Sequence, residues 1–205
     1  MRTAVFALTE AGAQLARRVG LALGDQASLF VSSRHATLGA QTFGRLREAV
    51  QENFHRYDAL VFIMAAGIAV RSIAPYLVSK LEDPAVVVLD EQGRHVISLL
   101  SGHVGGANRL TRALAAALGA EPVITTATDV EGLVAPDALA AELGLFPEPH
   151  AAILAVNSAM LRGDSISYYV DPACALASFY REELARRGLP VRELAERERG
   201  AGPQD

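Results

Sequence analysis

The stretch AVFALTEAGAQLARRVGLALGDQASLFV, residues 4–31, decides the fold. It begins and ends with short apolar runs that are compatible with β-strands buried on both faces. Between them, Thr9 can cap a helix whose apolar residues recur at helical spacing. A strand, a helix and a second strand in this order predict the start of a parallel sheet covered by helices.

The same alternation continues along the chain. We expect a helix at 43–54, a strand at 60–64 and a helix near 68–76. Apolar runs at 85–89 and 96–100 then flank a polar turn, which is the pattern of a β-hairpin. The sequence therefore predicts an α/β protein with a three-layer, Rossmann-like, mostly parallel sheet.

Beyond Asp129 the composition changes, and prolines punctuate shorter helical patterns. We expect an α/β N-terminal domain at 1–130, a second, smaller α/β lobe at 131–192, and a polar tail at 193–205. After the hairpin, we expect an alanine-rich helix through Leu118 and a short strand that starts at Val123 to complete the first domain.

Composition excludes several classes of protein. The 205 residues carry a net charge of -4 without a basic cluster, which argues against nucleic acid as a partner. The apolar runs are far shorter than the roughly 20 residues of a membrane-spanning helix, so no membrane association is expected. The N-terminus reaches Glu10 without the pattern of a secretory signal, and the single cysteine, Cys174, cannot form an intramolecular disulfide. We expect a cytoplasmic protein.

The segment SGHVGGAN, residues 101–108, is the strongest candidate for a site. It lies between a predicted strand and a predicted helix, where backbone N–H groups can bind an anion. Gly105 and Gly106 permit close approach of a ligand, and His103 supplies an imidazole. A tight glycine turn with a solvent-facing histidine explains the spacing equally well. A nucleotide site is the weaker alternative, because the Walker and GxGxxG patterns are absent.

Other polar residues have simpler explanations from local chemistry alone. Thr125, Thr126 and Asp129 follow a short strand and could face the same crevice, although a turn or helix cap is commoner. Glu91 in the hairpin loop could act as a base, but loop acids are usually only solvated. Arg71, one helical turn after Gly67, could place a guanidinium near carboxylates. The other four histidines show no metal-ligand spacing, so no metal site is expected.

Three longer stretches carry a family resemblance. The stretches GIAVRSIAP (67–75), DPAVVVLDEQGRHVISLLSGHVGGAN (83–108) and PVITTATD (122–129) closely resemble the cobalt-precorrin-5A hydrolases of anaerobic cobalamin biosynthesis. The resemblance covers about residues 1–129 and continues through AVNSAMLRGD (155–164). Full-length members usually carry a further C-terminal domain that this chain lacks. A separate C-terminal-domain protein, or neighbouring enzymes of the pathway, are therefore expected partners.

The resemblance implies hydrolysis of the ring-A lactone of cobalt-precorrin-5A to cobalt-precorrin-5B, with release of acetaldehyde. Cobalt enters with the tetrapyrrole substrate, so no separate cofactor is implied. Lactone opening needs activated water and stabilisation of an oxyanion. We assign His103 as general base, with Glu91 in reserve, and Ser101 as an orienting group. Backbone N–H groups around Gly105 and Gly106 are expected to stabilise the oxyanion or a substrate carboxylate. The remaining expected substrate-binding residues are Gly67, Arg71, Gly102, Asn108, Thr125, Thr126 and Asp129.

Two functions from other classes stay open. The chain could be a non-catalytic subunit that binds and carries the tetrapyrrole and is completed by a separate C-terminal domain. It could also be a nucleotide-binding module, which would respond to ATP or NAD and not to a corrinoid.

Overall fold

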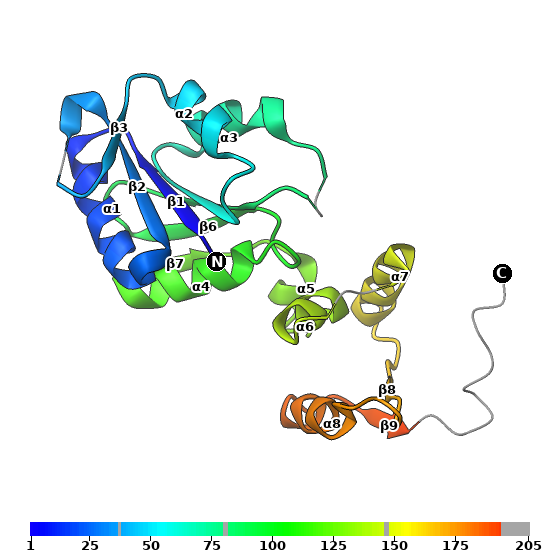
Figure 1. Cartoon of the computed structure of the whole chain (residues 1–205). Coiled ribbons are helices and arrows are strands. Elements are labelled where there is room, and N and C mark those ends of the chain that lie inside the picture. The colour runs from blue at the N-terminus through cyan, green and yellow to red at the C-terminus, as the bar shows by residue number, and fades with distance from the viewer. Residues whose placement is uncertain (37, 80–81, 146–147, 194–205) are drawn as a thin grey trace. The chain divides into compact units, whose positions relative to one another are not determined.

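The computed structural model describes the whole chain except residues 37, 80–81, 146–147 and 194–205 (Figure 1). The chain forms two compact units, Met1–Pro147 and Glu148–Asp205, and each is described here by itself. All residues of the predicted polar tail except the first lie outside the described residues. The described part contains no helix long and apolar enough to cross a membrane.

The first unit is built on a seven-stranded sheet with the order β3-β2-β1-β4-β5-β6-β7. Strands β1 to β5 run parallel, β6 runs antiparallel to β5, and β7 runs parallel to β6. The predicted mostly parallel sheet and the predicted hairpin are both confirmed. The strands are β1 (Thr3–Ala7), β2 (Ala27–Ser32), β3 (Gln41–Phe43), β4 (Ala59–Ile63), β5 (Ala85–Leu89), β6 (His95–Leu100) and β7 (Glu121–Val123).

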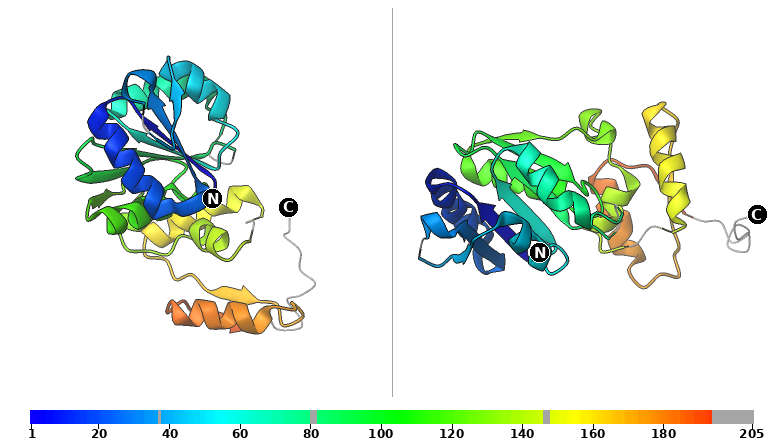
Figure 2. Two further views of the ribbon diagram at one scale, coloured as in Figure 1. Left: turned by 60° about the vertical axis from the view of Figure 1, so that its left-hand side comes forward. Right: turned by 90° about the horizontal axis from the view of Figure 1, so that it is seen from above.

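Helices cover both faces of this sheet and make the three layers visible in Figure 2. One core lies between the sheet and helices α1 and α4, and the other between the sheet and α2 and α3. Strands β1, β4 and β5 are buried along their whole length, as their continuous apolar sequences require. The four helices are α1 (Glu10–Leu23), α2 (Leu46–Asn53), α3 (Ala66–Ile73) and α4 (Ala107–Leu118), and three short 3₁₀ turns are Gly24–Gln26, Ser33–His35 and Ala74–Tyr76.

The helix predicted at 43–54 begins only at Leu46, because residues 41–43 form the edge strand β3. Phe43 at the end of this strand packs edge-on against Phe6, with 6.3 Å between the ring centroids. Three residues are too few to show the alternation by which a strand is recognised in sequence. Tertiary packing therefore determines the strand conformation of residues 41–43.

The reversal of β6 determines where the candidate site lies. Strands β1 to β5 end at one edge of the sheet, whereas β6 and β7 end at the opposite edge. The loop after β6 therefore returns to the edge at which β5 begins, and a Cβ placed on Gly105 would lie 3.5 Å from the Ala85 amide nitrogen. The two edges are separated by the length of β6, roughly 20 Å at about 3.3 Å per residue.

Two further helices, α5 (Ala127–Val130) and α6 (Pro136–Glu142), belong to the first unit. The predicted boundary after residue 130 therefore falls earlier than the division at Pro147. The physical reason is that α6 is anchored to the glycine-rich loop by an ion pair of Asp137 with His103, and Leu139 is buried. The changed composition beyond Asp129 marks an irregular part of the first unit.

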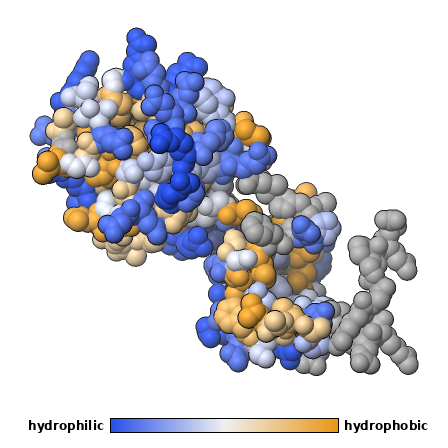
Figure 3. Space-filling view, in the orientation of Figure 1, coloured by the Kyte–Doolittle hydropathy of each residue, from blue (hydrophilic) through white to orange (hydrophobic). Residues whose placement is uncertain are grey.

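The second unit contains α7 (His150–Leu161), β8 (Tyr168–Val170), α8 (Ala177–Arg186) and β9 (Val191–Glu193). Strands β8 and β9 pair in parallel, so this unit is α/β as expected, although β9 was not predicted. Figure 3 shows hydrophobic residues on the visible face of this unit. Phe179 of α8 is one of its exposed large hydrophobic residues. An exposed aromatic ring on a unit this small leaves part of its apolar surface uncovered.

Candidate functional site

The glycine-rich loop connects β6 to α4 through a tight, hydrogen-bonded path. Ser101 adopts a left-handed backbone with φ 56°, and Gly106 does so with φ 85°. The amide of Ala107 donates to the Ser101 carbonyl oxygen at 3.1 Å, and the amide of Asn108 donates to the Gly102 carbonyl oxygen at 3.0 Å. A left-handed conformation is inexpensive only for glycine, so Ser101 is held there by its surroundings.

The tight path of the glycine-rich loop requires a residue without a side chain at position 105. A Cβ on Gly105 would lie 2.4 Å from the Ser101 Cβ and 2.8 Å from the Ser101 carbonyl oxygen. The second of these atoms is backbone and cannot rotate away. Gly105 therefore serves close packing of the loop on itself.

The amide donors expected to bind an oxyanion are partly occupied. The Gly106 amide donates to the His103 carbonyl oxygen at 3.0 Å, and the next two amides bond to loop carbonyls as described above. An amide that already donates has no hydrogen left for a ligand. The amides of Gly106, Ala107 and Asn108 are therefore not open to an anion.

His103 lies between two carboxylates. Its Nε2 is 2.8 Å from Oδ2 of Asp129 on α5, and its Nδ1 is 3.2 Å from Oδ2 of Asp137 on α6. The exposed fractions of the three side chains are 15%, 14% and 9%. An imidazole can donate from both nitrogens only when it is protonated, so this geometry favours the imidazolium.

The pKa directions agree with that geometry. The hydrogen bond to Asp137 raises the pKa of His103 above its ordinary value; burial opposes this, and Asp129 adds to it. Burial by itself would raise the pKa of Asp129, but hydrogen bonds from Arg112, Thr126 and His103 outweigh burial and lower it to about 2. Asp129 is therefore ionised at neutral pH and is a poor general base.

Asn108 extends the same network. Its amide nitrogen donates to Thr126 Oγ1 at 2.9 Å and to Asp129 Oδ2 at 2.8 Å, and its amide oxygen accepts from Ser98 Oγ at 2.6 Å. Gly102 lies against this amide, since a Cβ there would be 2.8 Å from the Asn108 oxygen. Asn108 thus ties β6, α4 and the segment after β7 together.

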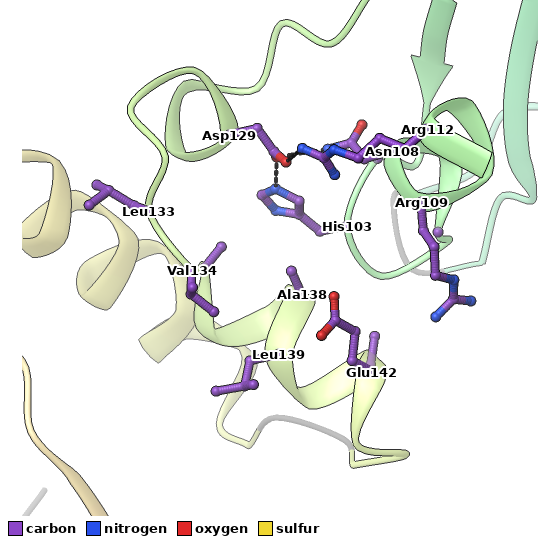
Figure 4. Close-up of a pocket in the computed structure, with 14 residues that line it drawn as sticks. His103, Asn108, Arg109, Arg112, Asp129, Leu133, Val134, Ala138, Leu139 and Glu142 are labelled. Carbon is purple, nitrogen blue, oxygen red and sulfur yellow. Dashed lines mark hydrogen bonds and ion pairs between the residues drawn. The ribbon is translucent and has the colours of Figure 1, made fainter. Parts of the chain in front are cut away.

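A cavity of about 170 Å³ opens beside this network, between the start of α4 and α5–α6 (Figure 4). Its polar side carries His103, Asn108, Arg109, Arg112 and Asp129. Its opposite wall is mainly apolar and consists of Leu133, Val134, Ala135, Ala138 and Leu139 together with Glu142 and Ala141. A pocket of this kind suits an organic ligand with one charged group.

The structure brings together one group of the predicted residues. Gly102, His103, Gly106, Asn108 and Asp129 line this cavity. Three further residues lie near it without lining it: Thr126 bonds to Asp129 at 2.6 Å, Ser101 has a buried hydroxyl with no partner among the described residues, and Gly105 packs on Ser101.

The other predicted residues do not join this cluster. Glu91 lies at the opposite edge of the sheet, where it accepts a hydrogen bond from Thr9 at 2.8 Å. Arg71 donates to the carbonyl oxygen of Gly67 in its own helix at 3.2 Å. Thr125 is exposed and outside the network. Glu91 and His103 are too far apart to act on the same bond.

Sequence reasoning missed Asp137, Arg109 and Arg112. Asp137 was assigned to a separate lobe, so its pairing with His103 had no local signal. Arg109 and Arg112 lie one and four residues after Asn108. The four-residue spacing places Asn108 and Arg112 on the same helical face. This i,i+4 spacing was the one available signal. The described residues include no group of three or more His, Cys, Asp or Glu placed to hold a metal ion.

Comparison with known protein families indicates the class of protein to which this chain is similar. Residues 48–129, which contain the sheet from β4 to β7 and the glycine-rich loop, match the family described as Cobalamin synthesis G N-terminal. This part of the chain is therefore similar to the N-terminal region of cobalamin synthesis G proteins. A crystal structure of a cobalamin biosynthesis protein G homolog from Sulfolobus solfataricus is similar, with a TM-score of 0.50 and 25% identity over 84% of this chain and 49% of that chain.

The particular relatives are cobalt-precorrin-5A hydrolases. The chain is 45% identical to the enzyme of Salmonella typhimurium over 170 residues, which are 82% of this chain and 48% of the relative. It is 39% identical to the enzyme of Priestia megaterium over 80% of this chain and 45% of the relative. The chain thus spans about half the length of the curated relatives it matches, and the resemblance seen in its sequence is confirmed.

Proposed function

We propose that this chain contributes the hydrolysis of the ring-A lactone of cobalt-precorrin-5A, which yields cobalt-precorrin-5B and acetaldehyde. The observation that carries the proposal is the histidine held between two carboxylates beside a partly apolar cavity, in a chain related to cobalt-precorrin-5A hydrolases. Cobalt would enter with the substrate, and no further cofactor is proposed. The cytoplasm is the proposed compartment. Neighbouring enzymes of the same pathway are the proposed partners.

We propose a different role for His103 from the general base expected from sequence. With both ring nitrogens bonded to carboxylates and a raised pKa, the resting side chain carries a proton that it can give away. The attacking water loses one proton to solvent as it adds to the lactone carbonyl and forms a tetrahedral intermediate. The ring oxygen of this intermediate must take up a proton as the carbon–oxygen bond breaks, and the donor is then reprotonated from solvent. His103 is proposed to supply this proton as general acid. A base role would first require loss of one of the two ion pairs.

The first test is anaerobic incubation of the purified chain with cobalt-precorrin-5A and trapping of acetaldehyde. We expect release above the no-enzyme control, with a loss of about 100-fold or more in His103→Gln. His55→Gln, which changes an exposed histidine outside the site, is the matched control and should keep wild-type release. Binding of the substrate without any product would contradict hydrolysis and indicate the carrier function instead.

The pH profile distinguishes acid from base. If His103 is the acid, turnover falls as pH rises through its raised pKa, because the proton is lost. If His103 is the base, turnover rises over the same range. A rising limb that disappears in His103→Gln would overturn the acid role.

A further inference from the structure

The cavity beside His103 contains three cationic side chains, and two of them are already paired. The imidazolium of His103 is shared by Asp129 and Asp137. The guanidinium of Arg112 is paired with Asp129. Their charges are therefore largely compensated within the protein.

Arg109 differs from both. It lies in the first turn of α4, lines the cavity, and forms no ion pair or hydrogen bond with its side chain among the residues that the structure describes. A Cβ on Gly106 would lie 3.4 Å from its Nη2, so the guanidinium passes over the bend of the loop. Figure 4 shows Arg109 leaving α4 on the side away from Asp129, while Arg112 points toward it.

The wall opposite this charge is mainly apolar, although the Glu142 side chain also lines it. Leu133, Val134 and Ala138 line the cavity from the α5–α6 segment, and Leu139 is buried beneath them. A ligand group that satisfies both sides has a short alkyl part and one carboxylate. An uncompensated guanidinium recognises a carboxylate through two parallel hydrogen bonds, which an amide or ester cannot accept with the same strength.

We propose that this cavity receives one carboxylate-bearing side arm of the tetrapyrrole and that Arg109 is the specificity-determining residue that binds the carboxylate. The proposal rests on the proposed function for the identity of the ligand. At about 170 Å³ the cavity is smaller than sites that enclose a whole drug-sized ligand, so the macrocycle would remain outside its mouth. Seating one arm would fix the macrocycle's position relative to His103 on the same cavity wall.

The test measures binding by absorbance titration with two probes: cobyrinic acid, a cobalt corrinoid with free carboxylate arms, and its fully amidated form. We expect the wild-type chain to bind the acid more tightly than the amide. Arg109→Gln should weaken binding of the acid by about tenfold and leave the amide unchanged, so that the preference disappears. Arg109→Lys, which keeps the charge and loses the planar fork, should fall between the two.

Arg47→Gln is the matched control, because Arg47 is exposed on α2, which covers the other face of the sheet. It should leave both affinities unchanged. Ala138→Phe, which fills the cavity and keeps Arg109, should weaken the acid as Arg109→Gln does. Equal loss of acid and amide binding in Arg109→Gln, or no acid preference in the wild-type chain, would overturn the proposal.

The two proposals fail in different ways. Acid preference that depends on Arg109, without any acetaldehyde from cobalt-precorrin-5A, supports the arm site and refutes the hydrolysis. Acetaldehyde release with an Arg109→Gln variant of unchanged affinity and unchanged KM supports the hydrolysis and refutes the arm site.

Discussion

The Asp129 carboxylate is the centre of the polar network, and its replacement by asparagine tests the network most directly. Asp129 accepts hydrogen bonds from Thr126, Asn108, His103 and Arg112. The substituted side chain in Asp129→Asn would have nearly the same shape, but it would carry no charge and would present N–H groups to donors. Truncating the acceptor of a buried network leaves its donors unpaired, which is the costly part of such a change.

The size of the effect follows from the pKa. Lowering the pKa of Asp129 from 3.8 to about 2 is a shift of less than two units, each equivalent to about 1.4 kcal/mol, so the ionised form gains at most about 2.5 kcal/mol. The Asp129 side chain is only 14% exposed, but Arg112 is 54% exposed, and solvent screens that part of the attraction. We therefore expect Asp129→Asn to lower the free energy of unfolding by about 2 kcal/mol.

Urea unfolding at pH 7, followed by far-ultraviolet circular dichroism, measures this loss. Asp25→Asn is the control, because Asp25 is exposed and should change stability by less than about 0.5 kcal/mol. The pH dependence has a definite sign: the contribution of Asp129 is present above its unfolded pKa of 3.8 and is lost as pH falls through about 2. An Asp129→Asn variant as stable as Asp25→Asn would refute the network as a source of stability.

Two further predictions concern the loop. Gly105→Ala should destabilise the chain by about 1–3 kcal/mol, because the added Cβ meets the Ser101 carbonyl oxygen. Gly44→Ala is the control: its added Cβ meets open space, so it should leave stability unchanged in the same urea assay. Equal urea midpoints for the two variants would contradict the packing argument. The pKa of His103 is raised in the folded state, so its contribution to stability is fully present below about pH 6.5 and lost as pH rises through the folded pKa. The stability difference between wild type and His103→Gln should therefore be larger at pH 6 than at pH 9, and the reverse order would show that His103 is held neutral.

Local sequence was sufficient for most of the fold, because a strand buried on both faces must be continuously apolar. The runs at β1, β4 and β5 could be recognised on that basis, and so could the β5–β6 hairpin. The edge strand β3 and the terminal strand β9 were missed, since each has three residues and depends on its partner for its conformation.

The glycine-rich loop was likewise recognisable as the site, because glycines and a histidine between a strand and a helix are a local pattern. The residues that give the site its chemistry were not local. His103 gains its proton-holding environment from Asp129 and Asp137, which are 26 and 34 residues away along the chain. No pattern within the loop carries that information.

What the sequence by itself determined is the type and order of most elements of the first sheet and the family that residues 48–129 resemble. What only the tertiary structure decided is which polar residues share a site. The antiparallel direction of β6 placed the loop at the edge opposite Glu91, and the packing of α5 and α6 brought two carboxylates and a mainly apolar wall to His103. The burial of a strand follows from the types of its own residues and can be recognised locally. Strand direction and helix packing, in contrast, join residues that are distant in the chain. The charge state of the site depends on those distant partners.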